Sequence, residues 1–121
     1  MNLKNWRKRN NSLSKSIKYA TQGILHLIEK EPNARIHIAA TILVTAIGIG
    51  LNLTAQKWFM LIAAMAMVWI TEALNTALER LCDHITPERN EQIKIVKDLG
   101  TGAVLVAAMA AIAIGLLVLL S

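Results

Sequence analysis

Charged residues are scarce in this sequence. They make up 17% of its 121 residues, whereas 55% are apolar, and typical soluble domains carry about 25% charged residues. This composition nearly excludes a water-soluble enzyme of this length. Cysteine is rare too. Cys82 is the single cysteine of the sequence, so an internal disulfide is excluded. The sequence also has no glycine-rich Walker loop and no HRD or DFG motif, which excludes the common soluble ways of holding a nucleotide.

Three long apolar runs dominate what is present. Residues 36–53 and 99–120 contain no Lys, Arg, Asp or Glu, and their lengths are near the about 17 to 25 residues that cross hydrocarbon. Residues 58–81 begin with WFMLIAAMAMVWI and carry charge only further on. The sequence therefore predicts an all-α integral membrane protein with three transmembrane helices.

The segment before the first run has an amphipathic helical pattern. Its apolar residues recur at three- and four-residue steps from Leu13 to Ile28, opposite polar residues such as Lys15 and Lys18. We expect a helix over about 12–30 that is ended by Pro32. Its basic face would lie against anionic headgroups at the membrane surface, and an ordinary helix packed on the bundle is an equally good interpretation.

The connecting segments are short. Between the second and third runs, Thr86 followed by Pro87 has the pattern of an N-cap with proline at the first helical position. This pattern predicts a short helix that leads into the third run. Because no long linker or internal repeat is visible, we expect residues 1–121 to form a single membrane domain.

Basic residues are unevenly distributed along the chain. Eight of the 13 precede the first run, four follow or end the second, and Lys57 lies between the two runs. By the positive-inside rule, the N-terminus and the second loop face the cytoplasm and the C-terminus faces outside. The net charge of +5 thus fits an anionic membrane surface, and no nucleic-acid partner is expected.

The second run carries a stripe of polar residues. Glu72, Asn75, Glu79 and Asp83 are spaced three, four and four residues apart, which places them on one helix face. With Trp58 as an outer anchor, Glu72 would lie roughly 21 Å into hydrocarbon that is about 30 Å thick. An ionised carboxylate at such depth costs about 2.5 to 3.5 kcal/mol or more. The stripe therefore indicates a function, and a structural polar seam between helices is the alternative.

A second polar set lies where the third run begins. Lys94, Lys97, Asp98 and Thr101 are expected near the same inner interface as Glu79. Carboxylates beside lysines are suited to a divalent cation bound to a polyphosphate, because Mg²⁺ takes one or two carboxylates plus phosphate oxygens. The pattern favours phosphoryl transfer, with a carboxylate taking the proton of the acceptor.

Three segments resemble the small prokaryotic diacylglycerol kinase and undecaprenol kinase family: EPNARIH (31–37), TEALNTALERLCD (71–83) and KIVKDLGTGAVLVAA (94–108). The resemblance covers about residues 12–115. It implies a lipid kinase of the bacterial inner membrane that uses ATP and Mg²⁺ to phosphorylate a lipid alcohol. It also implies a homotrimer in which each subunit has three spans and a surface helix, and in which neighbours share the active sites.

The resemblance also implies roles for individual residues. Glu72 matches the catalytic base that removes the proton from the lipid hydroxyl, and Asn75 matches the amide beside it. Glu79 and Glu31 match the carboxylates that hold the divalent metals. The positions on the nucleotide side are matched by the phosphate-binding Lys97 and by the acidic Asp98 and Asp83.

The chain departs from the diacylglycerol kinase branch at three places. Ser12 stands where an arginine is expected and His37 where a glutamate is, and no tryptophan lies near the end of the third run. We therefore favour undecaprenol as the acceptor, with diacylglycerol as the alternative. His37 itself is expected to be an interfacial residue that reaches for water rather than a nucleotide contact.

Two other classes of function remain open from the residues alone. In a small proton-coupled transporter, Glu72 would carry the proton or bind the substrate. Against this reading, the acidic residues cluster at one face of the membrane rather than across it. A noncatalytic scaffold would have no need for the stripe on the second run.

Overall fold

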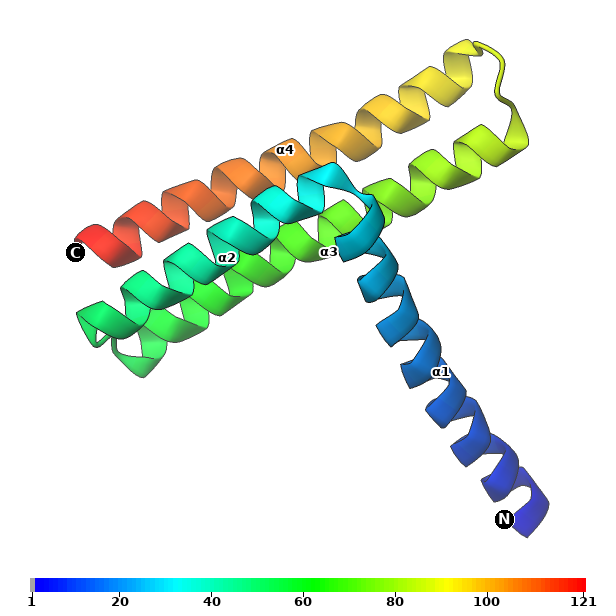
Figure 1. The fold of residues 1–121 in the computed structure, drawn as a ribbon, viewed down its shortest axis with the longest axis horizontal. Coiled ribbons are helices and arrows are strands. Elements are labelled where there is room, and N and C mark those ends of the chain that lie inside the picture. Colours follow the sequence, from blue (N-terminus) through cyan, green and yellow to red (C-terminus); the bar gives the residue numbers. More distant parts are fainter. Residues whose placement is uncertain (1) are drawn as a thin grey trace. The chain divides into compact units, whose positions relative to one another are not determined.

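The polypeptide forms only helices and short connections in the part that the structure describes. The structure is a computed structural model that describes residues 2–121, apart from the side chains of residue 3 and residues 6–10. Its helices are α1 (Leu3–Lys30), α2 (Pro32–Leu51), α3 (Ala55–Ile85) and α4 (Glu91–Leu120) (Figure 1). The all-α prediction is therefore confirmed.

Three of these helices are long and apolar enough to cross a membrane. They are α2, α3 and α4, with 20, 31 and 30 residues. Helices α3 and α4 extend beyond the apolar runs at their polar ends, so that polar turns continue past the roughly 20 residues that hydrocarbon requires. The prediction of three spans is confirmed.

The junction between α1 and α2 is set by a proline. The backbone N–H of Glu31 donates to the carbonyl of Leu27 at 3.2 Å and closes α1. Pro32 then begins α2, where its missing N–H removes no helical hydrogen bond. The break at Pro32 was expected, whereas α1 begins earlier than expected, at Leu3. The chain divides near this junction into two compact units, Met1–Ala34 and Arg35–Ser121.

The turn between α2 and α3 uses residues with special backbone preferences. Asn52 has a φ of 56°, in the left-handed region that asparagine tolerates better than most residues. Thr54 then caps α3, because its Oγ1 accepts the backbone N–H of Lys57 at 3.3 Å. Gly48 is buried beside the Trp58 ring, which a Cβ at that position would meet at 2.8 Å. The missing side chain lets α2 approach the first turn of α3.

The prediction of a short helix after Thr86 is wrong. The backbone N–H of Thr86 donates to the carbonyl of Cys82 at 3.1 Å, so this residue ends α3 rather than beginning a helix. Its hydroxyl accepts the N–H of Glu88 and holds a turn. Asn90 is the actual N-cap of α4, since its Oδ1 accepts from Gln92 N at 2.9 Å. The continuous helix α4 therefore replaces the predicted short helix and the third apolar helix.

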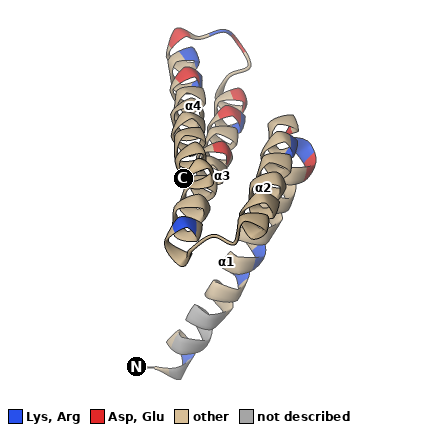
Figure 2. Cartoon of the chain, turned by 90° about the vertical axis from the view of Figure 1, so that its left-hand side faces the viewer, with Lys and Arg blue, Asp and Glu red and all other residues tan. Residues whose placement is uncertain are grey.

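Helices α3 and α4 are antiparallel neighbours along their length (Figure 1). At one end, Lys57 Nζ donates to the backbone carbonyl of Ser121 at 3.0 Å. Apart from Lys57, the charged residues of both helices lie toward the other end, near the loop that joins them (Figure 2). This packing brings the polar end of α3 next to the polar start of α4.

Few large side chains are buried within the unit Arg35–Ser121. The buried apolar residues of α3 and α4 include Leu61, Ala64, Val68, Ala107 and Val118. Many large apolar side chains of α2, α3 and α4 are instead exposed, such as Ile42, Leu43, Phe59, Leu105 and Leu117. Continuous exposed apolar surface of this kind is typical of a lipid-facing or subunit-facing protein.

Candidate active site

The polar stripe of α3 passes from the interior of the unit to its surface. Because α3 is unbroken from Ala55 to Ile85, the spacing of the stripe places its members on one face of the helix: Glu72, Asn75, Glu79 and Asp83. Glu72 is 3% exposed and Asn75 8% exposed. Glu79 is half-buried and Asp83 is exposed. A carboxylate as deeply buried as Glu72 needs a partner, because an isolated buried charge is costly.

The partner of Glu72 is His37. The Nε2 atom of this histidine, on α2, lies 3.3 Å from Glu72 Oε2 on α3. The two side chains are 19% and 5% exposed. The expectation that His37 reaches for water is therefore wrong. The imidazole instead contacts the buried carboxylate of α3.

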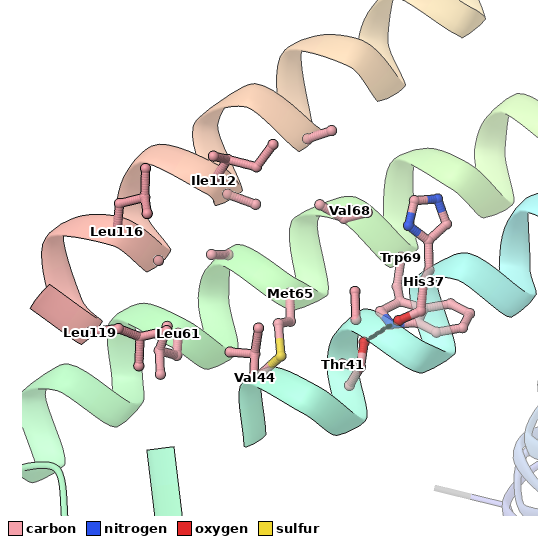
Figure 3. Close-up of a pocket in the computed structure, with 15 residues that line it drawn as sticks. His37, Thr41, Val44, Leu61, Met65, Val68, Trp69, Ile112, Leu116 and Leu119 are labelled. Carbon is pink, nitrogen blue, oxygen red and sulfur yellow. Dashed lines mark hydrogen bonds between the residues drawn. The ribbon is translucent and has the colours of Figure 1, made fainter. Parts of the chain in front are cut away.

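A tryptophan and a threonine fix the position of His37. The Trp69 indole packs edge-on against the imidazole, with ring centroids 6.1 Å apart. Trp69 Nε1 donates to Thr41 Oγ1 at 3.0 Å, and Thr41 Oγ1 donates to the backbone carbonyl of His37 at 2.7 Å. Figure 3 shows these three side chains together at one end of a pocket. They tie α2 to α3 one helical turn from Glu72.

Asn75 has one satisfied and one unsatisfied polar atom. Its Nδ2 donates to Glu79 Oε1 at 3.3 Å. Its Oδ1 is buried and has no hydrogen-bond partner among the described residues. This oxygen faces Gly100 of α4, where any Cβ would collide with it. A buried acceptor without a partner is unusual in a folded protein, so the Asn75 amide is oriented at the expense of one hydrogen bond.

Two ion pairs lie beyond Glu79 at the polar ends of the helices. Lys97 Nζ of α4 donates to Asp83 Oδ1 of α3 at 2.5 Å. Lys94 Nζ donates to Asp98 Oδ2 at 2.6 Å, within α4. All four residues belong to the predicted polar sets, which the structure brings side by side. Exposed ion pairs of this kind are weak, so these lysines can exchange partners.

Glu31 belongs to the other compact unit. It is the C-cap of α1 and is half-buried. Glu72, Asn75, Glu79, Asp83, Lys97 and Asp98 all belong to the unit Arg35–Ser121. Among the described residues, no group of three or more His, Cys, Asp or Glu side chains is arranged to hold a metal ion.

An apolar pocket begins at His37. It has a volume of about 380 Å³ and is lined by α2, α3 and α4. His37, Thr41 and Trp69 lie at one end, and Leu116 and Leu119 lie toward the other (Figure 3). Its wall is almost wholly apolar. A hydrocarbon chain is therefore the kind of ligand that this pocket suits.

Sequence reasoning missed the contacts of His37 and Gly100. The histidine is 35 positions from Glu72, and no local pattern predicts that α2 turns it toward α3. The available signal was a lone imidazole at the start of an uncharged run, at the inner end where the polar stripe was expected. Gly100 stands in the KDxG pattern, but only the register of α3 against α4 reveals why a side chain does not fit there.

Comparison with known proteins agrees with the resemblance. Residues 18–119 match the family model described as prokaryotic diacylglycerol kinase. An undecaprenol kinase of Bacillus subtilis is 33% identical over 120 residues, covering 99% of this chain and 98% of that protein. A diacylglycerol kinase of Escherichia coli K12 is 32% identical and covers 81% of this chain and 80% of its own length.

A third relative is a diacylglycerol kinase of Synechocystis. It is 37% identical over 101 residues, which are 83% of this chain and 58% of the longer relative. These relatives are lipid kinases, which are phosphotransferases that take the phosphate from ATP. The model match and the relatives lead to one conclusion: this chain is a membrane enzyme that belongs to the prokaryotic diacylglycerol kinase family.

Proposed function

We propose that this protein transfers the γ-phosphate of ATP to the hydroxyl of undecaprenol at the cytoplasmic face of the inner membrane, with Mg²⁺ as the metal. The observation that carries the proposal is Glu72, a buried carboxylate of a membrane-length helix that lies one turn from the Asn75–Glu79 pair. A base at this depth is suited to an acceptor whose hydroxyl lies in the membrane.

Glu72 acts as the general base. One of its oxygens takes the proton from the lipid hydroxyl as the hydroxyl oxygen forms a bond to the γ-phosphorus. The bond between this phosphorus and the bridging oxygen of ATP breaks, and ADP leaves with that electron pair. The products are a lipid phosphate and a protonated Glu72, which returns its proton to solvent before the next cycle.

Glu79 and Glu31 would hold the magnesium. The donor set fits this ion, since Mg²⁺ uses one or two protein carboxylates and takes its other ligands from phosphate and water. Glu79 keeps one carboxylate oxygen that Asn75 does not contact. When bound, the metal neutralises charge on the transferring phosphoryl group. Asn75 holds the Glu79 carboxylate through its Nδ2 atom.

Lys97, Asp83 and Asp98 would form the nucleotide side of the site. Lys97 is a point charge for the phosphates, and the exposed carboxylate of Asp83 is the partner that the phosphates would replace. Asp98 would contact the sugar or the base of the nucleotide. Its present partner, Lys94, is on the same exposed turn of α4.

The acceptor assignment rests on two features of the chain. Its similarity to an undecaprenol kinase extends over nearly the whole of both proteins. In addition, Ser12, His37 and the absence of a tryptophan near the end of α4 depart from the diacylglycerol kinase pattern. The apolar pocket beside His37 supports a long hydrocarbon acceptor. Diacylglycerol is the second candidate, because the E. coli and Synechocystis relatives carry that name.

We also propose that residues 1–121 act as one membrane domain within a homotrimer, with the N-terminus in the cytoplasm. The asymmetry of the basic residues supports this orientation. The exposed apolar face of α1, with Leu13, Ile17 and Ile24, supports a surface helix in the headgroup region. The exposed apolar surfaces of α2 and α4 offer area for neighbouring subunits.

The test is a phosphate-transfer assay on the purified protein in mixed micelles. Radiolabelled ATP and Mg²⁺ are offered with undecaprenol or with diacylglycerol, and Glu72→Gln serves as the blank. Labelled undecaprenyl phosphate as the preferred product is the expected result. Preference for diacylglycerol would overturn the acceptor assignment, and transfer to neither lipid by folded protein would contradict the kinase proposal.

A further inference from the structure

His37 is a polar residue for which the proposed chemistry has no role yet. Its Nε2 atom lies 3.3 Å from Glu72 Oε2, across the interface between α2 and α3. A general base takes its proton as a carboxylate, which only accepts hydrogen bonds, so we assign the hydrogen of this contact to Nε2. The bond therefore engages one specific oxygen of the catalytic carboxylate.

The geometry divides the work between the two oxygens of Glu72. Because His37 occupies Oε2, Oε1 is the oxygen that can turn to the acceptor hydroxyl. A glutamate side chain has three rotatable bonds, and a donor on one oxygen limits the orientations of the other. Such an orientation is what a general base requires, since proton transfer needs a heavy-atom distance of about 2.6 to 3.2 Å.

The imidazole is itself held in place. Trp69 packs against its ring at a centroid distance of 6.1 Å, and Thr41 donates to its backbone carbonyl at 2.7 Å. Trp69 also donates to Thr41, which closes the link between α2 and α3. A histidine fixed from several sides is suited to hold another side chain in one orientation.

His37 also lies where the apolar pocket ends. The pocket is lined by His37 and Thr41 of α2 and continues along α3 and α4 (Figure 3). The hydrogen bond to Glu72 therefore joins the buried base to the end of the space suited to a hydrocarbon chain. The hydrogen bond that limits the orientation of Glu72 therefore lies beside the pocket in which the lipid chain would bind.

We infer that His37 is a positioning residue for Glu72: its Nε2–H holds Oε2, and Oε1 is thereby aimed at the acceptor hydroxyl. The inference rests on the proposed role of Glu72 as the base. As phosphate transfer proceeds, the hydroxyl proton moves to Oε1 and the hydroxyl oxygen bonds to the γ-phosphorus. ADP leaves, and the His37 hydrogen bond stays on Oε2 throughout.

The test compares four variants in the lipid kinase assay, with thermal unfolding in detergent measured alongside. His37→Ala removes the donor, and His37→Gln keeps an N–H donor near the position of Nε2. Glu72→Gln tests the base itself. His26→Ala is the matched control, because it removes an exposed histidine of α1 that has no role in the proposed site.

We expect His37→Ala to lower kcat about 10- to 100-fold, as the loss of a group that orients a functional side chain does elsewhere. The KM values for ATP and lipid should stay close to those of the unchanged protein. His37→Gln should recover most of the lost kcat, and His26→Ala should have no effect. This combination would not arise from a merely structural link between helices.

Wild-type kcat in His37→Ala, with Glu72→Gln inactive, would overturn the inference and leave the proposed function standing. Equal loss of kcat in folded His37→Ala and His37→Gln would overturn it as well, because the donor would then not be the cause. If His37→Ala does not fold, the kcat of His37→Gln decides: near wild type supports the inference, and a large loss overturns it. Full activity of Glu72→Gln would refute the proposed base and the inference together.

Discussion

Asn75 of α3 and Gly100 of α4 face each other so closely that a side chain at position 100 would collide with Asn75 Oδ1. The same asparagine donates to Glu79 from its other amide atom. The orientation of a proposed active-site amide therefore depends on a missing side chain in a different helix. This contact also sets the distance between α3 and α4 where the polar stripe passes into the interior.

Gly100→Ala should therefore damage both stability and activity. The added methyl group must move α4 or rotate Asn75, and overpacking of this kind costs about 1 to 3 kcal/mol. Thermal unfolding in detergent and kcat of the lipid kinase reaction measure the two effects. Gly102→Ala is the control on the same helix, because a Cβ there meets nothing within 4 Å. Equal behaviour of the two variants would contradict the close contact.

Lys97→Ala should raise the KM for ATP. A hydrogen bond to a charged group contributes about 1.5 to 3 kcal/mol, which corresponds to a roughly 10- to 150-fold rise. Initial rates over a range of ATP concentrations at saturating lipid measure the effect. Arg89→Ala removes the same charge from the loop between α3 and α4 and should leave the KM unchanged. An unchanged KM for ATP in Lys97→Ala would show that this lysine does not bind the nucleotide phosphates.

Glu79→Gln should weaken the response to magnesium. Losing a direct carboxylate ligand should raise the Mg²⁺ concentration for half-maximal activity about tenfold or more, since even groups that only support a ligand have effects of about that size. Titration of MgCl₂ at fixed free ATP measures the shift, and a chelator should abolish activity in the unchanged protein. The control is Glu88→Gln in the exposed loop. Identical Mg²⁺ curves for Glu79→Gln and the unchanged protein would argue against a metal role for Glu79.

Gly115→Leu should reduce the affinity for the lipid acceptor. Gly115 lines the apolar pocket, and a Cβ there meets nothing within 4 Å, so there is space at the pocket wall for an added side chain. We expect a higher KM for the lipid and an unchanged KM for ATP. Gly50→Leu, on α2, adds the same side chain at an equally open position away from the pocket. A lipid KM unaffected by Gly115→Leu would exclude the pocket as the acceptor site.

The helices were predictable because their signals are local. Long apolar runs predicted α2, α3 and α4, and Pro32 predicted the boundary between α1 and α2. The loop after α3 was predicted wrongly because Thr86-Pro87 and Asn90 are competing caps, and the local pattern favoured the first. Only the structure shows that Asn90 Oδ1 accepts the N–H groups of Gln92 and Ile93 in the first turn of α4.

The stripe on α3 was predictable for the same local reason. Its spacing follows helical periodicity, and the burial of Glu72 follows from its depth in an apolar run. The hydrogen bond of His37 and the space at Gly100 depend on which faces of separate helices meet. Sequence periodicity contains no information on the relative rotation of two helices, and these two contacts could not be predicted from it.

The central claim is that Glu72 is the base of a lipid kinase, and the most direct measurement is the kcat of Glu72→Gln. Glutamine has nearly the same shape as glutamate but cannot take the hydroxyl proton, so a loss of about 10²- to 10⁴-fold is expected. The variant should keep its unfolding temperature and its affinity for ATP. Transfer of labelled phosphate to the lipid at the wild-type rate by folded Glu72→Gln would contradict the account.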